Sequence, residues 1–236
     1  MKAPADQKLP EIVPIGDKPP YTAELLRSLG LTGLHCGSGR NLIHGFVNTD
    51  IMIFRGVDDV QTEEGMISVI NGKQYYMPHD STKNYPFQEG SFDHVYSEHF
   101  IEHITPVEAL KWMKEVRRLL KPGGTARIST PDLELFTAGY FDPKGNFNAG
   151  FIDRLNRMGM SISTTRKAFV MNLIFREWGH QWLYDFQEIK TVALQAGFME
   201  GMVTRCGYRE GKSAPLRSLD LEVRNDHSLY VEITRE

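Results

Sequence analysis

This sequence has few cysteines, nearly balanced charges and no long apolar runs. Cys36 and Cys206 are the only cysteines among 236 residues, too few for a disulfide framework. The formal net charge is −3, from 27 basic and 30 acidic residues, which is not the pattern of a general nucleic-acid binder. No apolar run approaches the roughly 20 residues that span a membrane, and no charged-then-apolar leader opens the chain. We therefore expect a reduced, cytoplasmic protein without a membrane segment, and we disfavour a nucleic-acid partner.

What is present is enough apolar material for a folded core. Hydrophobic residues make up 41% of the chain and aromatic residues 11%, and the length suits one α/β domain. Residues 1–20 hold five prolines, which is typical of an extended N-terminal arm. We expect this arm to be followed by a single domain over residues 21–236.

Strand-like and helix-like segments alternate along most of the chain. A hairpin on a type I′ Asn71-Gly72 turn is predicted between residues 66 and 77. Residues 131–184 form an irregular, aromatic-rich insertion with one or two helices. The alternation predicts a doubly wound, mostly parallel sheet covered on both faces. Outside the hairpin and the insertion, the predicted strands are 33–36, 46–51, 92–97, 125–130, 201–206 and 228–233, and the predicted helices are 22–28, 106–120 and 185–197.

A glycine turn after one strand and an acid after the next are typical of a nucleotide-like ligand site. The first lies in Leu34-His35-Cys36-Gly37-Ser38-Gly39 and the second in Asn48-Thr49-Asp50. Glycines let the backbone approach the ligand, and the carboxylate accepts hydrogen bonds from ribose hydroxyls. A nicotinamide site would have a third glycine where Leu42 stands, so that class is disfavoured. A tight turn with an unrelated surface acid is the alternative.

Further motifs follow in a fixed order. They are Tyr85-Pro86-Phe87, Gly90-Ser91-Phe92-Asp93 and Leu119-Leu120-Lys121-Pro122-Gly123-Gly124. Together with the glycine turn, this order resembles the class I S-adenosylmethionine-dependent methyltransferases. Within them it is similar to the small-molecule, type 11-like branch, whose first crossover is short. The resemblance implies a Rossmann-like methyltransferase fold with a seven-stranded sheet, the hairpin as one insertion and residues 131–184 as a helical lid on the acceptor side.

The resemblance also implies roles for single residues. Gly37 and Gly39 would approach the cofactor, Asp50 would bind its ribose and Asp80 would lie near the adenine. Asp80 has a second interpretation, as the cap of its own loop. Ser97 and Glu98 would lie under the methionine moiety. The predicted set for S-adenosyl-L-methionine is Cys36, Gly37, Ser38, Gly39, Asp50, Ile51, Asp80, Ser97 and Glu98.

The segment from Glu98 to His103 is a partial match to a metal motif. It resembles the E-x-x-E-H stretch of relatives that methylate RNA ends or catechol-like rings, but His99 replaces the first glutamate. His99, Glu102 and His103, completed by His180, could ligate a divalent ion. We favour the alternative that Glu102 and His103 organise the substrate wall, and we predict no metal. The Asn/Asp-Pro-Pro-Tyr/Phe stretch of enzymes that methylate DNA or amide nitrogens is missing at this point.

Histidines are the candidate catalytic groups. His180 resembles the histidine of an H-x-W-x-Y-D stretch that faces the acceptor pocket, and imidazole accepts protons near neutral pH. We rank His180 first as a base, with His99 and His103 behind it. The alternative for His180 is a packed side chain between Trp178 and Trp182, bonded to backbone.

The second half of the chain is locally basic. Some of these side chains could hold a carboxylate or phosphate of the acceptor, although a solvated face is the more common role of such residues. They are Arg154, Arg157, Arg166, Arg176, Arg205, Arg209, Lys212, Arg217 and Arg224.

The sequence therefore predicts methyl transfer to an oxygen or nitrogen of a small molecule, such as a natural product, a sugar or an anionic metabolite. A metal-assisted RNA-end methyltransferase and a non-catalytic cofactor-binding scaffold are the alternatives. The sequence leaves open whether the protein is a monomer or a homodimer.

Overall fold

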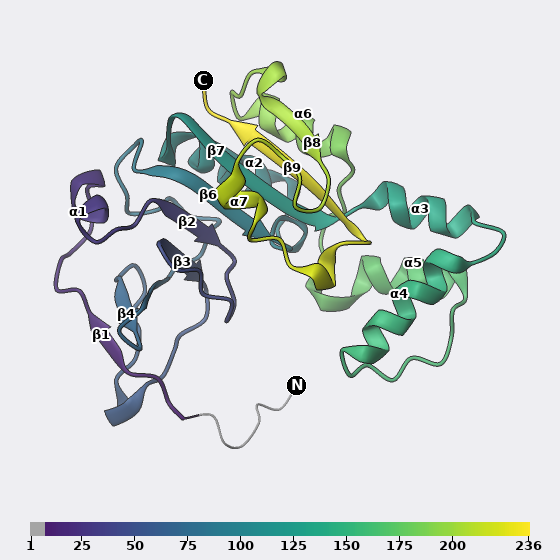
Figure 1. Ribbon diagram of the computed structural model, residues 1–236, viewed down its shortest axis with the longest axis horizontal. Coiled ribbons are helices and arrows are strands. Elements are labelled where there is room, and N and C mark those ends of the chain that lie inside the picture. Colours follow the sequence, from purple (N-terminus) through teal and green to yellow (C-terminus); the bar gives the residue numbers. More distant parts are fainter. Residues whose placement is uncertain (1–7) are drawn as a thin grey trace.

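A single sheet runs through the protein in the computed structural model, which describes residues 8–236 (Figure 1). In this part of the chain the sheet has nine strands in the order β1-β4-β5-β3-β2-β6-β7-β9-β8. The strands are β1 (Ile12–Pro14), β2 (Gly33–Cys36), β3 (Phe46–Asp50), β4 (Ser68–Ile70), β5 (Gln74–Pro78), β6 (Phe92–Glu98), β7 (Leu120–Pro131), β8 (Val203–Cys206) and β9 (Ser228–Thr234).

The predicted α/β class and mostly parallel centre are confirmed. Strands β5, β3, β2, β6 and β7 pair in parallel, whereas β9 runs antiparallel between β7 and β8. These seven strands form the predicted sheet. The order reverses at β2, between β3 and β6, which opens a crevice beyond the carboxyl ends of the strands.

Two further strands extend the sheet at the β5 edge. Strand β4 is the first arm of the predicted hairpin, and its turn has positive φ at both Asn71 and Gly72. Strand β1 comes from the segment that we expected to be an extended N-terminal arm. Ile12 is buried against Ile70 and Tyr76, so this apolar contact fixes the segment to β4. Residues 1–7 of the expected arm lie outside the described part.

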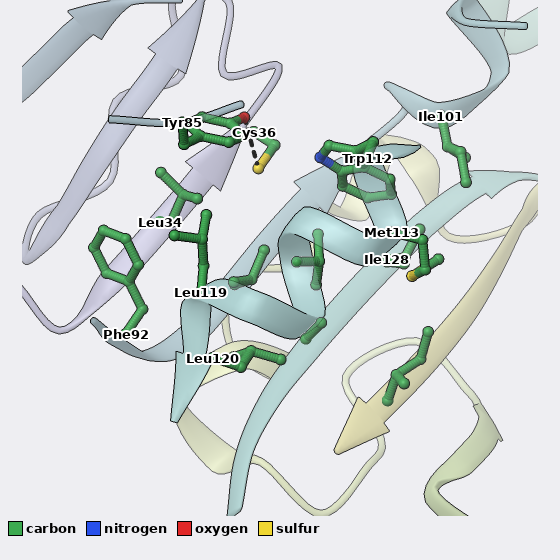
Figure 2. Packing of buried hydrophobic residues seen from close by; sticks show 14 of the residues in the cluster. Leu34, Cys36, Tyr85, Phe92, Ile101, Trp112, Met113, Leu119, Leu120 and Ile128 are labelled. Carbon is green, nitrogen blue, oxygen red and sulfur yellow. Dashed lines mark hydrogen bonds between the residues drawn. The ribbon is translucent and has the colours of Figure 1, made fainter. Parts of the chain in front are cut away.

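Helices cover one face of the sheet. Helices α1 (Ala23–Ser28), α2 (Pro106–Leu119) and α6 (Phe186–Gln195) pack there. Thr105 and Glu108 begin α2 with a reciprocal capping box. Figure 2 shows Trp112, Met113 and Leu119 of α2 lying against side chains of the strands. Because strand side chains alternate, this face receives the apolar residues Leu34, Val95, Ile128 and Val231.

The other face is polar and is covered by loops and the short helix α7 (Ala214–Arg217). The crossover between β2 and β3 contains no helix, and Asn48 holds it. The Asn48 Oδ1 accepts from the Ile43 N–H at 2.8 Å, and its Nδ2 donates to the carbonyls of Ile43, Phe46 and Tyr75. Asn48, two residues before Asp50, therefore supports the short crossover.

Arg127 ties the β8–β9 connection to this polar face. Its side chain is fully buried, and all five of its N–H groups are used. Two donate to Asp220 at 2.7 and 2.6 Å and one to Glu232 at 3.0 Å. The other two donate to the carbonyls of Gly207 and Glu210.

The insertion forms three helices, where we expected one or two. Helices α3 (Leu133–Phe141), α4 (Asn146–Arg157) and α5 (Lys167–Arg176) share an apolar cluster of their own around Phe136, Phe151 and Val170. They lie together at one end of the molecule, away from β1 (Figure 1). Among residues 8–236, no helix combines the length and apolarity needed to cross a membrane. Short 3₁₀ turns complete the structure: η1 (Val57–Asp59), η2 (Ile101–His103), η3 (Glu177–Gly179), η4 (Glu200–Met202) and η5 (Glu222–Arg224).

Removing the Arg127 guanidinium should destabilise the fold strongly. Arg127→Met leaves Asp220 and Glu232 buried without their cation, which costs about 3–5 kcal/mol in comparable buried pairs. Urea unfolding measures the loss. Glu200→Gln, which breaks a surface pair with Lys190, should have little effect. Equal midpoints for both variants would contradict a structural role for Arg127.

Candidate functional site

A cavity of about 560 Å³ lies at the carboxyl ends of β2, β3, β5 and β6. It is the crevice at the strand-order reversal, where ligands of such sheets bind. Its lining is Gly37, Asp50, Ile51, His79, Asp80, Ser81, Thr82, His99, Phe100, His103, Ile104, Glu108 and Gln181.

The glycine turn and Asp50 are one hydrogen-bonded unit. Gly37 has a φ of +66°, and a Cβ there would stand 2.8 Å from the Phe100 side chain, so only glycine fits. The Gly39 N–H donates to Asp50 Oδ2 at 2.9 Å, and the Met52 N–H donates to Oδ1 at 3.1 Å. A carboxylate has about four acceptor positions, so Asp50 keeps lone pairs for a ligand in the cavity.

Asp80 lines the cavity and also caps its own loop. Its Oδ1 accepts from the Thr82 N–H at 3.0 Å and the Thr82 hydroxyl at 2.7 Å. Burial alone would raise its pKa, but the Thr82 hydrogen bonds and nearby Lys83 outweigh it and lower the pKa below the usual value. Asp80 is therefore a carboxylate at neutral pH, available to an amino group.

Five of the nine residues expected at the cofactor lie outside the cavity lining, and one of them is Gly39, whose N–H holds Asp50. Strand alternation turns Glu98 to the polar face, where it accepts from the Tyr96 hydroxyl at 3.1 Å. Cys36 points into the core under Tyr85, and burial raises the pKa of its thiol to about 11. Ser38 and Ser97 are also buried. Cys36, Ser97 and Glu98 thus belong to the strand ends beside the cavity, but their side chains do not line it.

A second cavity, of about 350 Å³, lies between the sheet end and the helical insertion. His99 and His103 belong to both linings, so the two cavities meet at these side chains. The remaining lining of the second cavity is Pro131, Phe151, Arg154, Leu155, Met158, Met160, Ile174, Trp178, His180, Arg224 and His227.

His180 presents a free nitrogen to this second cavity. Its Nδ1 lies 2.6 Å from the Ile174 carbonyl, which can only accept, so Nδ1 carries the proton and Nε2 has the lone pair. Burial, with a smaller contribution from the charge of Arg224, lowers the pKa of His180 below its usual value. The expected backbone bond of His180 is thus present, and it orients the ring.

The other two candidate histidines differ in their contacts and in their exposure. His99 has both nitrogens engaged, with Nε2 2.7 Å from the Ser228 hydroxyl and Nδ1 3.3 Å from Glu102. Its φ of +48° is a strained conformation for so large a side chain. His103 is about one-third exposed, and its ring lies 4.9 Å from that of His180. Burial and then His180 lower the pKa of His103.

Glu102 lies beneath this histidine cluster. It is fully buried, accepts from the Thr130 hydroxyl at 3.0 Å, and burial raises its pKa to about 8. One ligand atom each from Glu102, His103 and His180 lie within 4.8 Å of one another, so these three could hold a metal. This group does not include His99, which we had considered as a ligand.

His79, Gln181 and His227 line the cavities but were not selected from the sequence, and Arg224 was selected only as one of nine basic side chains. His79 and Gln181 face the cofactor-side cavity, while Arg224 and His227 reach the second cavity from the segment before β9. His79 directly follows β5 and could have been inferred from the strand-end rule. The other three depend on contacts between distant segments.

The raised pKa of Glu102 predicts a pH-dependent stability. Between the ordinary pKa of 4.5 and about 8, the folded chain keeps a proton on Glu102 that the unfolded chain releases. Its contribution is therefore complete below about pH 4.5 and is lost as pH rises toward 8. Glu102→Gln, which imitates the protonated acid, should lose this slope in melting curves from pH 5 to 8. Exposed Glu64→Gln is the control, and parallel curves for Glu102→Gln and wild type would contradict the assignment.

Comparisons with known proteins were informative at the level of the family. No curated protein shows significant sequence similarity to the chain. Structures it resembles include the CurJ carbon methyltransferase, at 15% identity and a TM-score of 0.46, over 87% of this chain and 48% of that one. The chain thus spans about half of that protein.

Two other similar structures match over most of both chains. One is a methyltransferase dependent on S-adenosylmethionine (SAM) from Archaeoglobus fulgidus, with 13% identity, a TM-score of 0.47 and coverage of 90% and 92%. The other is a possible histamine N-methyltransferase from Thermotoga maritima, with 13% identity, a TM-score of 0.47 and coverage of 91% and 87%.

Residues 34–128 match the model of the methyltransferase domain family. This segment begins in β2, ends in β7, and contains the glycine turn, Asp50 and the strand-order reversal. The match shows a methyltransferase domain over these residues, and the seven-stranded sheet with its antiparallel β9 agrees with the fold of class I S-adenosylmethionine-dependent methyltransferases.

Proposed function

We propose that this methyltransferase acts on an oxygen or nitrogen of a small molecule that binds in the second cavity. The observation that carries the proposal is the meeting of two cavities at His99 and His103. A volume of about 350 Å³ suits a small ligand. The test is transfer of a labelled methyl group from SAM to a panel of hydroxyl and amine acceptors. Cofactor binding without transfer to any acceptor, including those of a cell extract, would favour a non-catalytic scaffold.

The cofactor-side cavity fits SAM. Gly37 lines the cavity without a side chain, Asp50 has free lone pairs for ribose hydroxyls, and Asp80 can accept from the adenine amino group. Bound SAM supplies a methyl group already activated by its sulfonium. The protein must then hold the acceptor in line and exclude water. The wall from α4 and α5 is suited to exclude water, because Phe151, Leu155 and Ile174 are buried and apolar.

Removing the Asp50 carboxylate should weaken SAM binding. Hydrogen bonds to a charged group contribute about 1.5–3 kcal/mol, so Asp50→Ala should raise the dissociation constant roughly tenfold to hundredfold. Calorimetric titration measures it, with exposed Asp153→Ala as the control. Unimpaired binding by a folded Asp50→Ala protein would refute the placement of the ribose.

We propose His180 as the base for a hydroxyl acceptor. Its Nε2 lone pair is free, and its lowered pKa keeps the ring neutral at pH 7. The acceptor proton would pass to Nε2 while the Ile174 carbonyl stabilises the imidazolium through Nδ1–H. A neutral nitrogen acceptor needs only positioning, so this role applies to oxygen acceptors.

His180→Gln should lower kcat with a hydroxyl acceptor by about 10²–10⁴-fold. In the wild type, activity should fall as pH drops through the lowered pKa of His180, because protonation removes the lone pair. Exposed His44→Gln should keep wild-type rates and the same pH profile. A His180→Gln enzyme with unchanged kcat and pH profile would contradict the role.

A metal-assisted reaction is the second candidate, favoured by the convergence of Glu102, His103 and His180. There His180 Nε2 would be a ligand and not a base, and an ion would activate the acceptor. This chemistry follows from the partial match of residues 98–103 to the E-x-x-E-H stretch of RNA-end methyltransferases. The net charge of −3, however, does not favour binding of a nucleic acid. Activity that survives chelation supports His180 as the base. Activity lost to a chelator and restored by Mn²⁺ or Zn²⁺ supports the metal.

A further inference from the structure

The acceptor-side cavity contains cations but no carboxylate. Its lining has two arginines and four histidines, and no aspartate or glutamate among the residues described. Arg154 and Arg224 supply the fixed positive charge of the cavity wall, because a guanidinium is not deprotonated in proteins.

The two arginines differ in how closely their charges are paired with carboxylates. Arg154 pairs with Asp226 and contacts His227 Nδ1, so its charge is compensated at the cavity edge. Arg224 is one-third exposed, and its nearest carboxylate oxygen is Glu98 Oε1, 3.9 Å from Nε. That distance exceeds a hydrogen bond. The buried Nε has no hydrogen-bond partner within residues 8–236.

Arg224 lines the same cavity as His99, His103 and His180. The rest of this cavity has an apolar wall from α4, α5 and the connection between them. It is formed by Phe151, Leu155, Met158, Met160 and Ile174.

We propose that the methyl acceptor is an anionic amphiphile, whose carboxylate or phosphate binds Arg224 and whose apolar body packs on the helical wall. This inference rests on the proposed function of the same cavity. Guanidinium binds both anions through paired N–H donors, and the one-third exposed Arg224 side chain lines this cavity. The anion would hold the acceptor with its reacting atom toward His180 and the shared wall of His99 and His103. A protonated amine would meet an uncompensated cation, so cationic acceptors are disfavoured.

The test is a binding experiment that needs no turnover. Protein saturated with S-adenosylhomocysteine, which fills the cofactor side, is titrated by NMR with four probes of one shape. They are phenylacetate, phenyl phosphate, neutral 2-phenylethanol and cationic phenethylamine. The wild type should bind at least one anionic probe about tenfold or more tightly than the alcohol, as expected for a charged hydrogen bond. Whichever anion binds more tightly identifies carboxylate or phosphate as the preferred group.

Three variants test whether Arg224 causes the tighter binding of anionic probes. Arg224→Gln should remove the advantage of the anionic probes and leave 2-phenylethanol unchanged, which also reports that the cavity is intact. Arg224→Lys should keep part of it, and Arg217→Gln on exposed α7 should keep all of it. Equal binding of neutral and anionic probes, tightest binding of the amine, or an unchanged preference in Arg224→Gln would each overturn the inference. Methyl transfer to a neutral acceptor would still support the proposed function in those cases.

Discussion

Glu102 ties together the segments that surround the two cavities. Its carbonyl accepts from the Gln181 N–H at 2.7 Å and the Trp182 N–H at 3.2 Å, which ties the segment carrying His180 to η2. Its buried carboxyl meets the Thr130 hydroxyl at the end of β7 and lies beside His99. Burial raises the pKa of this carboxyl, so it can stay protonated and avoid an unpaired buried charge. Together with the His180–Ile174 bond, these contacts fix the position of His180.

The polar face of the sheet explains how the fold manages with a short first crossover. A helix on that face would bury apolar strand residues, but here side-chain amides and ions satisfy the loops that replace it. Asn48 bonds the crossover itself, and Arg127 bonds the β8–β9 connection. That connection carries Arg224 toward the acceptor cavity. The same arrangement that supports the sheet thus positions the cation we assign to the acceptor.

Local features were predictable from the sequence, and features that depend on distant contacts were not. The strand ends, the Gly37 turn and Asp50 follow from apolar periodicity, glycine geometry and the position of an acid after β3. Glu98 was placed at the cofactor because it ends a strand, but the two-residue alternation turns it to the opposite face. The pairing of β1 with β4 depends on burial of Ile12, a tertiary contact that proline content obscures. No sequence pattern could bring Arg224 into one cavity with His180, because the two residues are 44 positions apart, with helix α6 and strand β8 between them.

The central claim is that methyl donor and acceptor meet at the wall shared by His99 and His103. A crystal structure with S-adenosylhomocysteine tests it most directly. The account predicts the ribose on Asp50 and the thioether sulfur at the His99–His103 wall, facing the second cavity. A ligand elsewhere, such as the open cavity lined by Arg40 and Arg55, or a sulfur turned away from the second cavity, would contradict it.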